Sequence, residues 1–141
     1  MLEQALHTIS IKTRGPGFTD VTARLIDWLR SIGARDGLLT LFIRHTSASL
    51  TIQENADPDV LRDLMDALQR SAPRDARYRH GIEGPDDMPA HIKSMLTATS
   101  IGIPVGGGRP VLGTWQAVYL IELRDRPHTR DIALHFVGTL D

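Results

Sequence analysis

The last third of the chain restricts the possible folds most, because strand-like segments follow one another there with no helix between them. Apolar and small residues alternate over 101–105, and the triple glycine 106–108 marks a turn. A longer run over 111–123 is apolar on both faces, and 130–138 has the pattern of a final strand. Strands that succeed one another without crossover helices favour a mostly antiparallel sheet, which predicts the α+β class.

Three helices and further strands are predicted before this region. One helix runs between an N-cap at Thr19 and a C-terminal stop at Gly33. A second begins at Asp57-Pro58, because Asp caps a helix and Pro suits its first position. A third, short helix begins at Pro89, after a loop over 71–87. Strands are expected over 6–13, 37–44 and 48–53, so the total is five or six strands and three helices in one domain of 141 residues.

The composition excludes several classes of protein. Lys plus Arg is 16 and Asp plus Glu is 17, which argues against a general nucleic-acid binder. The chain has no cysteine, so disulfides, thiolate metal sites and a Cys nucleophile are excluded, and a cytoplasmic location fits. No secretory signal pattern is present at the start, and no apolar run approaches the roughly 20 residues that span a bilayer. We therefore expect no nucleic-acid or membrane partner.

The segment Arg44–Ser49 is the first candidate site, because polar residues follow an apolar strand abruptly. His45 stands beside Arg44, and the hydroxyl residues Thr46, Ser47 and Ser49 come directly after them. Small hydroxyl residues with exposed backbone N–H groups suit phosphate oxygens, and an arginine adds a charged fork. A β-turn capped by Ser or Thr is the simpler alternative.

Acidic residues at the start of the second helix form another candidate. Glu54, Asn55, Asp57 and Asp59 lie within six residues and could hold Mg²⁺ through water, since hard cations prefer oxygen ligands. Helix capping explains two of them equally well, because Asp57 caps and Asp59 complements the helix dipole. Glu54 and Asn55 precede the cap and are not explained in that way.

Histidines from a loop and a helix suggest a metal site. His80 and His91 bracket an acidic, Gly- and Pro-rich segment, and His45 lies at a strand end. Three imidazoles that converge would suit Zn²⁺ with an open position. A surface loop with incidental histidines is the alternative. Of the two acids before Pro89, we expect Asp87 to cap the third helix and Asp86 to face the pocket, because two adjacent carboxylates cannot both be the cap.

A glycine inside the predicted strand 111–123 suggests a bulge or a close approach of backbone. It belongs to the segment Gly113-Thr114-Trp115-Gln116, in which the Gln116 amide can point into a site.

Three segments together resemble one protein family. His45–Pro58, Glu83–Lys93 and Gly113–Gln116 agree in order and spacing with motifs of the YjbQ family, and the likeness extends over nearly the whole chain. The resemblance implies a single YjbQ-like domain over 1–141, with a mostly antiparallel β-sandwich decorated by about three helices. It also implies a homotrimer. The two-sided apolar run over 111–123 supports this, because a small one-sided sheet needs less.

The resemblance further implies secondary thiamine-phosphate synthase activity. Such an enzyme transfers a pyrimidine-methyl group from its diphosphate to a thiazole phosphate, so the leaving charge must be neutralised and the two rings held together. Phosphorylated substrates and a divalent metal, Zn²⁺ or Mg²⁺, are expected. In this interpretation His45, His80 and His91 bind the metal; Asp86, Asp87, Glu54 and Gln116 are catalytic; and Arg44, Thr46, Ser47, Ser49, Asn55, Lys93, Gly113 and Thr114 bind the substrate.

Two other functions fit the same residues. The trimer can be a non-enzymatic protein that binds a metal or a phosphorylated metabolite, or a hydrolase that uses metal-bound water. Imidazoles together with cations favour phosphorylated ligands over neutral ones, but they do not separate turnover from binding.

Overall fold

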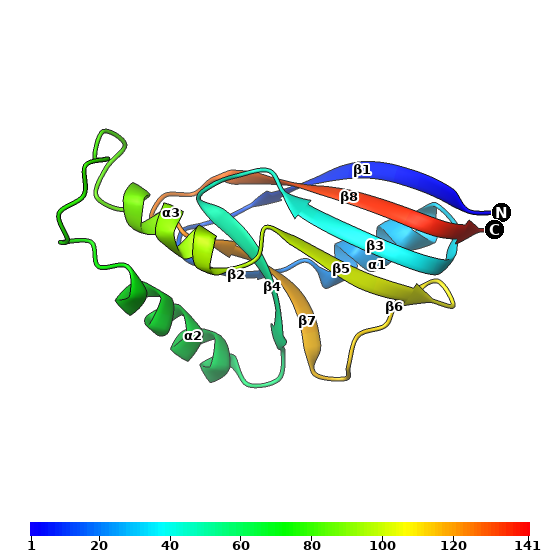
Figure 1. Ribbon diagram of the computed structural model, residues 1–141. Helices are drawn as coiled ribbons and strands as arrows, with labels where there is room; N and C mark the ends of the chain where they lie inside the picture. Colours follow the sequence, from blue (N-terminus) through cyan, green and yellow to red (C-terminus); the bar gives the residue numbers. More distant parts are fainter.

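Two antiparallel sheets pack face to face, with helices at one edge and at one end (Figure 1). The computed structural model describes all residues, 1–141. One sheet has five strands in the order β1-β8-β3-β5-β6, and the other has three in the order β2-β7-β4. The strands are β1 (Glu3–Lys12), β2 (Gly17–Asp20), β3 (Ala34–Ile43), β4 (Ala48–Glu54), β5 (Ser100–Gly106), β6 (Arg109–Pro110), β7 (Gln116–Glu122) and β8 (Thr129–Leu140); the helices are α1 (Thr22–Ser31), α2 (Pro58–Ser71) and α3 (Asp87–Leu96). The predicted α+β class and antiparallel sandwich are confirmed.

The main core lies between the two sheets. Alternate residues of β3, Leu39, Leu41 and Ile43, point inward and are buried, as the two-residue period of a strand requires. Val118 and Leu120 of β7 meet them from the other sheet. Helix α1 covers the remaining side of this core with Leu25, Trp28 and Leu29.

Strand β7 is shorter than predicted, and its two-sided burial has an explanation within one chain. It occupies only 116–122 of the expected 111–123. One face belongs to the main core through Val118 and Leu120. The other face packs Ile121, together with Leu123 just beyond the strand, against Ala90 of α3 and toward α2. Burial of 117–123 on both faces therefore needs no second subunit, whereas Val111 and Trp115 of the same run are exposed.

The first residues of the three helices agree with the sequence-based predictions in one case and differ in two. Asp57 caps α2 as predicted, and its side chain accepts a hydrogen bond from the Asp59 N–H at 2.9 Å. The predicted cap Thr19 lies instead in β2, and Asp20 accepts from the Thr22 N–H at 2.9 Å at the start of α1. Helix α3 begins at Asp87, two residues before the predicted Pro89.

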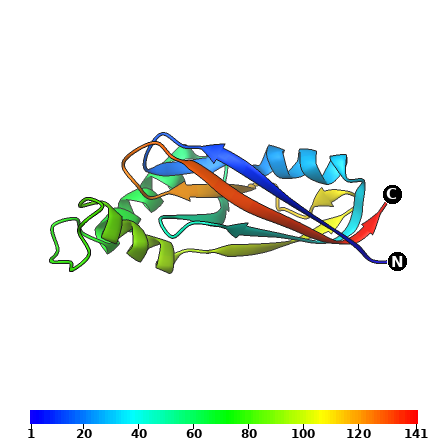
Figure 2. The same ribbon diagram turned by 90° about the horizontal axis from the view of Figure 1, so that it is seen from above.

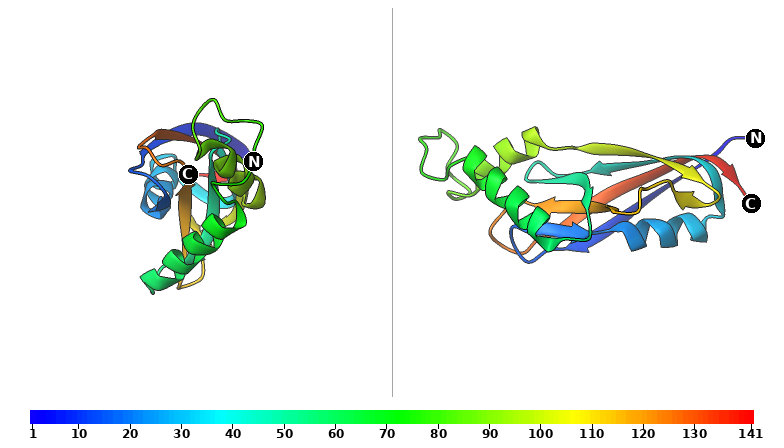
Figure 3. Two further views of the ribbon diagram at one scale, coloured as in Figure 1. Left: turned by 90° about the vertical axis from the view of Figure 1, so that its left-hand side faces the viewer. Right: turned by 90° about the horizontal axis from the view of Figure 1, so that it is seen from below.

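The ends of the molecule are distinct. Helix α3 and the loop 72–86 lie at the end opposite both chain termini (Figures 1 and 2). Helix α2 lies beside the three-stranded sheet (Figure 3). Its Met65 and Leu68 pack against the cluster that contains Ile121. No helix combines the length and the apolar character that crossing a membrane requires. At the end opposite the termini, the strands of the sandwich therefore end next to α3 and the loop 72–86.

Candidate functional site

Two histidines and one aspartate meet at this end of the molecule. Asp87 and His91 are four residues apart on α3 and therefore share one face, and His80 comes from the preceding loop. The Asp87 Oδ2 atom lies 2.6 Å from His80 Nε2 and 3.1 Å from His91 Nε2. One ligand atom from each residue lies within 4.8 Å of the others, which is close enough to hold one metal ion.

The backbone carbonyl of Thr46 orients His91. It lies 2.9 Å from His91 Nδ1, and a carbonyl can only accept, so Nδ1 carries a proton. A neutral imidazole has a single N–H, which leaves His91 Nε2 as a lone pair directed at the cluster. Only an imidazolium or a bound cation makes this arrangement favourable beside the Asp87 carboxylate. Metal-binding histidines are commonly held through the second nitrogen in this way.

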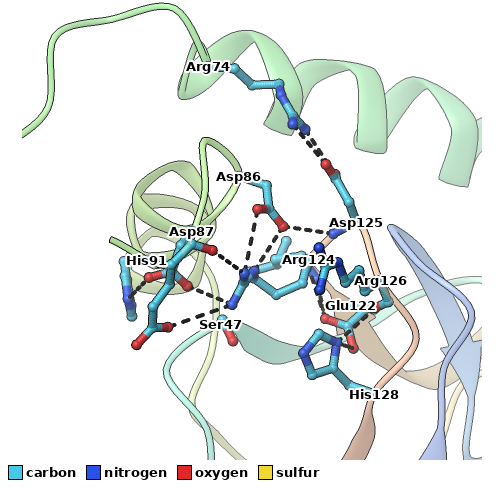
Figure 4. A network of polar contacts seen from close by, with 12 residues as sticks. Ser47, Arg74, Asp86, Asp87, His91, Glu122, Arg124, Asp125, Arg126 and His128 are labelled. Atoms are coloured by element: carbon cyan, nitrogen blue, oxygen red, sulfur yellow. Dashed lines mark hydrogen bonds and ion pairs between the residues drawn. The ribbon is translucent and has the colours of Figure 1, made fainter. Parts of the chain in front are cut away.

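Arg124 holds the carboxylate side of the cluster (Figure 4). It comes just after β7, and its side chain is only 15% exposed. Its guanidinium lies 2.9 Å from Asp87 Oδ1, donates to Asp86 Oδ2 at 2.8 Å, and donates to the Glu83 carbonyl at 2.9 Å. Arg124 was not among the residues predicted from the sequence. The only signal was a charged residue directly after a buried apolar strand.

The predicted roles of the two adjacent aspartates are reversed. Asp87 faces the histidines, whereas Asp86 occupies the N-cap position of α3 without making a side-chain cap. The Asp86 carboxylate instead accepts from Arg124 and from the Asp125 N–H. The reason is the early start of α3, which places Asp87 one turn before His91.

Asp86 makes the folded protein sensitive to acid. Burial favours its neutral form, but hydrogen bonds from Arg124 and the Asp125 N–H outweigh this and lower its pKa from 3.8 to about 2. A lowered folded-state pKa means that the ionised carboxylate stabilises the fold above about pH 4, and that this contribution is lost as pH falls from about 4 to about 2.

We expect this contribution to be on the order of 2 kcal/mol. Urea unfolding of the Asp86→Asn variant should show a flatter dependence on pH between about 4 and 2 than the wild type. Asp27→Asn is the matched control, because Asp27 is 72% exposed and pairs only loosely with Arg30 at 3.8 Å. An unchanged acid profile in Asp86→Asn would contradict the assignment.

His45 does not join the metal cluster, contrary to the prediction of three converging imidazoles. Its Nε2 accepts from the Asp131 backbone N–H at 2.8 Å, so that lone pair is already used. Burial, with the charge of Arg130, lowers the pKa of His45. His45 instead lines a neighbouring pocket of about 510 Å³. The other lining residues are Phe42, Ile43, Arg44, Thr46, His91, Ser94, Met95 and Thr99.

Three predicted substrate-binding residues are used inside the fold. Ser49 is fully buried and accepts from the Thr97 hydroxyl at 2.6 Å. Lys93 is 2% exposed and donates to the Gln69 side chain at 2.7 Å, and burial lowers its pKa. Ser47 is also buried and does not line the pocket. Of the predicted phosphate-binding residues near His45, only Arg44 and Thr46 reach it.

Five further candidates lie at the opposite end of the three-stranded sheet. Strand β4 runs from Ala48, next to the cluster, to Glu54, and seven residues of strand separate its ends by about 20 Å. At the far end Glu54 accepts from the Asp57 N–H at 3.3 Å. Gln116 accepts from the Gly113 N–H at 2.7 Å and closes that turn. The structure therefore does not bring these residues to the histidines: Glu54, Asn55, Gly113, Thr114 and Gln116.

A buried ion pair supports the strand ends beneath the site. Arg130 donates to Glu122 through Nε at 2.8 Å and through a terminal nitrogen at 2.5 Å, and it also donates to the Ser47 carbonyl at 3.2 Å. Thr13 donates to Glu122 at 2.6 Å. Burial disfavours the ionised form of Glu122, but these hydrogen bonds outweigh it and lower its pKa. This pair, which was not predicted from the sequence, links β7 and β8 to the loop that carries His45.

The chain resembles one family over almost its whole length. A sequence model described as UPF0047 protein YjbQ-like matches residues 7–139. A UPF0047 protein of Synechocystis sp. is 51% identical over 136 residues, which cover 96% of this chain and 92% of the relative. The UPF0047 protein YjbQ of Escherichia coli O157:H7 is 42% identical over 139 residues, which cover 98% of this chain and 99% of the relative.

Solved structures agree with the fold. A YjbQ/UPF0047 family protein from Clostridium acetobutylicum is 37% identical with a TM-score of 0.85, covering 92% of this chain and 98% of that one. A YbjQ-like protein of unknown function from Sulfolobus solfataricus has a TM-score of 0.89 over 99% of this chain and 100% of that one. Its identity of 19% supports likeness of fold alone.

These names contradict the predicted function. The relatives are named only as UPF0047 proteins, and the Sulfolobus protein is described as having unknown function. None of the names carries the thiamine-phosphate synthase activity that the resemblance implied, so that prediction is wrong, and its alternatives gain no support from the names. The chemistry must therefore be argued from the geometry of the site.

Proposed function

The chain belongs to the YjbQ-like UPF0047 family, and we propose that it is a metal-dependent enzyme whose divalent cation is bound by His80, Asp87 and His91. The observation that carries this proposal is the convergence of their three ligand atoms within 4.8 Å. The Thr46 carbonyl on the far nitrogen of His91 adds to it, because it aims the lone pair of Nε2 at the cluster.

The donor set favours one kind of metal. Two imidazole nitrogens and one carboxylate suit Zn²⁺ and similar transition metals, whereas Mg²⁺ prefers oxygen ligands. Bound there, such an ion would act as a Lewis acid toward an oxygen atom of the substrate. Three protein ligands would leave a coordination position open for it.

The chain's own residues have separable tasks in this proposal. Arg124 keeps Asp87 ionised and fixed, and the Thr46 carbonyl fixes His91. The pocket beside His91 takes the substrate, which we propose to be a phosphorylated small molecule. Arg44 supplies a cation there, and no acidic residue lines the pocket. Arg44 therefore attracts an anion to this pocket, and no carboxylate in the lining repels it.

Metal titration tests the proposal directly. Protein stripped with a chelator should bind one Zn²⁺ per chain in isothermal titration, and it should bind Mg²⁺ far more weakly. His7→Ala is the matched control, since this histidine lies on β1, stacks on Trp28 of α1 and has no contact with the cluster. A wild-type protein that binds Zn²⁺ no better than nonspecifically would contradict the proposal.

The family resemblance also leads us to propose a homotrimer in the cytoplasm. A second copy would cover apolar side chains on the outer face of the five-stranded sheet, where Leu6 is 75% exposed and Phe42 is 48% exposed. The strand register places Leu38 and Val137 on the same face. Sedimentation equilibrium should then give three times the chain mass of 15.6 kDa, and a monomer at micromolar concentration would contradict it.

A further inference from the structure

His45 has a defined protonation pattern, although it lies outside the metal cluster. The backbone N–H of Asp131 can only donate, so His45 Nε2 must be the acceptor across their 2.8 Å contact. A neutral imidazole that accepts through Nε2 carries its proton on Nδ1. The lowered pKa of His45, caused by burial and by Arg130, agrees with this neutral form.

The backbone that sets this pattern is rigid. Asp131 lies in β8 between β1 and β3, and its carbonyl accepts from the Arg44 N–H at 3.1 Å. The backbone of Asp131 therefore binds both residues: its N–H donates to the His45 ring, and its carbonyl accepts from the Arg44 N–H. The His45 ring is therefore already oriented before a ligand binds, so little free energy is needed to position its Nδ1–H donor.

The Nδ1–H of His45 is free to bind a ligand. It makes no hydrogen bond within the chain, and His45 lines the same pocket as His91. Arg44, which makes no ion pair, and Thr46 line this pocket too. The Asp131 carboxylate is engaged by Ser10 at 2.7 Å and is not part of the lining. The polar residues that line this pocket therefore offer an imidazole N–H, a guanidinium and hydroxyls.

We infer that His45 is a fixed N–H donor to an anionic oxygen of the ligand, and that with Arg44 it forms a phosphate-binding subsite beside the metal cluster. The inference rests on the proposed function and deepens it, because it assigns the anionic group of the substrate to named residues. A phosphate group fits better than a carboxylate, since its three or four oxygens can engage Nδ1–H, the guanidinium fork and the Thr46 hydroxyl at once.

Two substitutions at His45 separate ligand binding from structural support. A Gln side chain offers a carbonyl oxygen where Nε2 lies, so His45→Gln keeps an acceptor for the Asp131 N–H and loses the Nδ1 donor. An Asn side chain offers an N–H₂ group near Nδ1, so His45→Asn keeps a donor and loses the acceptor. If His45 only anchored its loop, His45→Gln would be the harmless variant of the two.

The experiment is isothermal titration of zinc-loaded protein with inorganic phosphate, with acetate as the comparison anion. The wild type should bind phosphate more tightly than acetate. His45→Gln should weaken phosphate binding by about tenfold to a hundredfold, as expected for a lost hydrogen bond to a charged group, with Zn²⁺ affinity unchanged. His45→Asn should recover part of the loss. Arg44→Gln, at an exposed side chain that carries no fold contact of its own, should weaken phosphate binding as well.

Phosphate affinity that is unchanged in both His45→Gln and Arg44→Gln would overturn the inference, and so would a zinc-loaded wild type that binds no phosphate. His7→Gln is the control, and it should leave phosphate binding as in the wild type, because His7 stacks on Trp28 and does not line the pocket. Repeating the titration on metal-free protein separates the two proposals. If the protein binds no Zn²⁺ but its phosphate binding still depends on His45, the metal proposal is refuted. If it binds Zn²⁺ but its phosphate binding does not depend on His45, only the subsite is refuted.

Discussion

Replacement of Arg130 by Met is expected to lower the free energy of unfolding by about 3–5 kcal/mol, as for other buried ion pairs that lose one partner. Arg130 is 4% exposed and Glu122 is 1% exposed, so the variant leaves a carboxylate buried without its cation. Thr13 and two backbone N–H groups still donate to Glu122, but they bring no opposite charge. Urea unfolding at neutral pH measures the difference.

The double variant Arg130→Met with Glu122→Leu separates the lost charge pair from lost packing. Removal of both partners is expected to restore most of the stability, since a buried ion pair replaced by apolar residues is often neutral. Arg35→Met is the matched surface control, because Arg35 pairs with Asp141 at 58% and 67% side-chain exposure. That pair should contribute at most about 1 kcal/mol. A loss in Arg130→Met as small as in Arg35→Met would refute the role assigned to the buried pair.

Loss of a metal ligand is the second large effect. His80→Ala and Asp87→Ala should each lower Zn²⁺ affinity by more than about a hundredfold, because removal of residues that merely orient ligands already costs about 10–100-fold. His80 is the cleaner test of the two. Its side chain is 42% exposed in a loop, so the fold does not depend on it, whereas Asp87 also binds Arg124.

Arg124→Gln tests the same site from outside the ligand set. The guanidinium holds Asp87 Oδ1 at 2.9 Å, so its removal should weaken Zn²⁺ binding by about 10–100-fold without abolishing it. The expected order of affinities is therefore wild type, then Arg124→Gln, then His80→Ala. Equal Zn²⁺ affinity in the wild type and in His80→Ala would place the metal elsewhere or exclude it.

Much of the fold follows from local patterns in the sequence. The alternation in β5 and β8, the Asp57-Pro58 helix start and the close succession of late strands each depend on neighbours within a few residues. The extended apolar run around β7 was also informative. Its residues 117–123 are buried on two faces because a second, smaller core forms under α3, so this burial is not evidence for another subunit.

The candidate site was also predictable only in part. Residue type, spacing and backbone preference are local, so they were sufficient to predict the family, the α+β sandwich and the two segments that meet at the candidate site. Which side chains meet there depends on contacts between distant parts of the chain. His45 and His91 belong to equally good motifs, yet the Asp131 N–H occupies one nitrogen of His45, while Thr46 directs the free nitrogen of His91 toward Asp87. Each histidine is far from its backbone partner in the chain, Asp131 for His45 and Thr46 for His91. The nitrogen that stays free to bind a metal depends on which atom binds the other ring nitrogen.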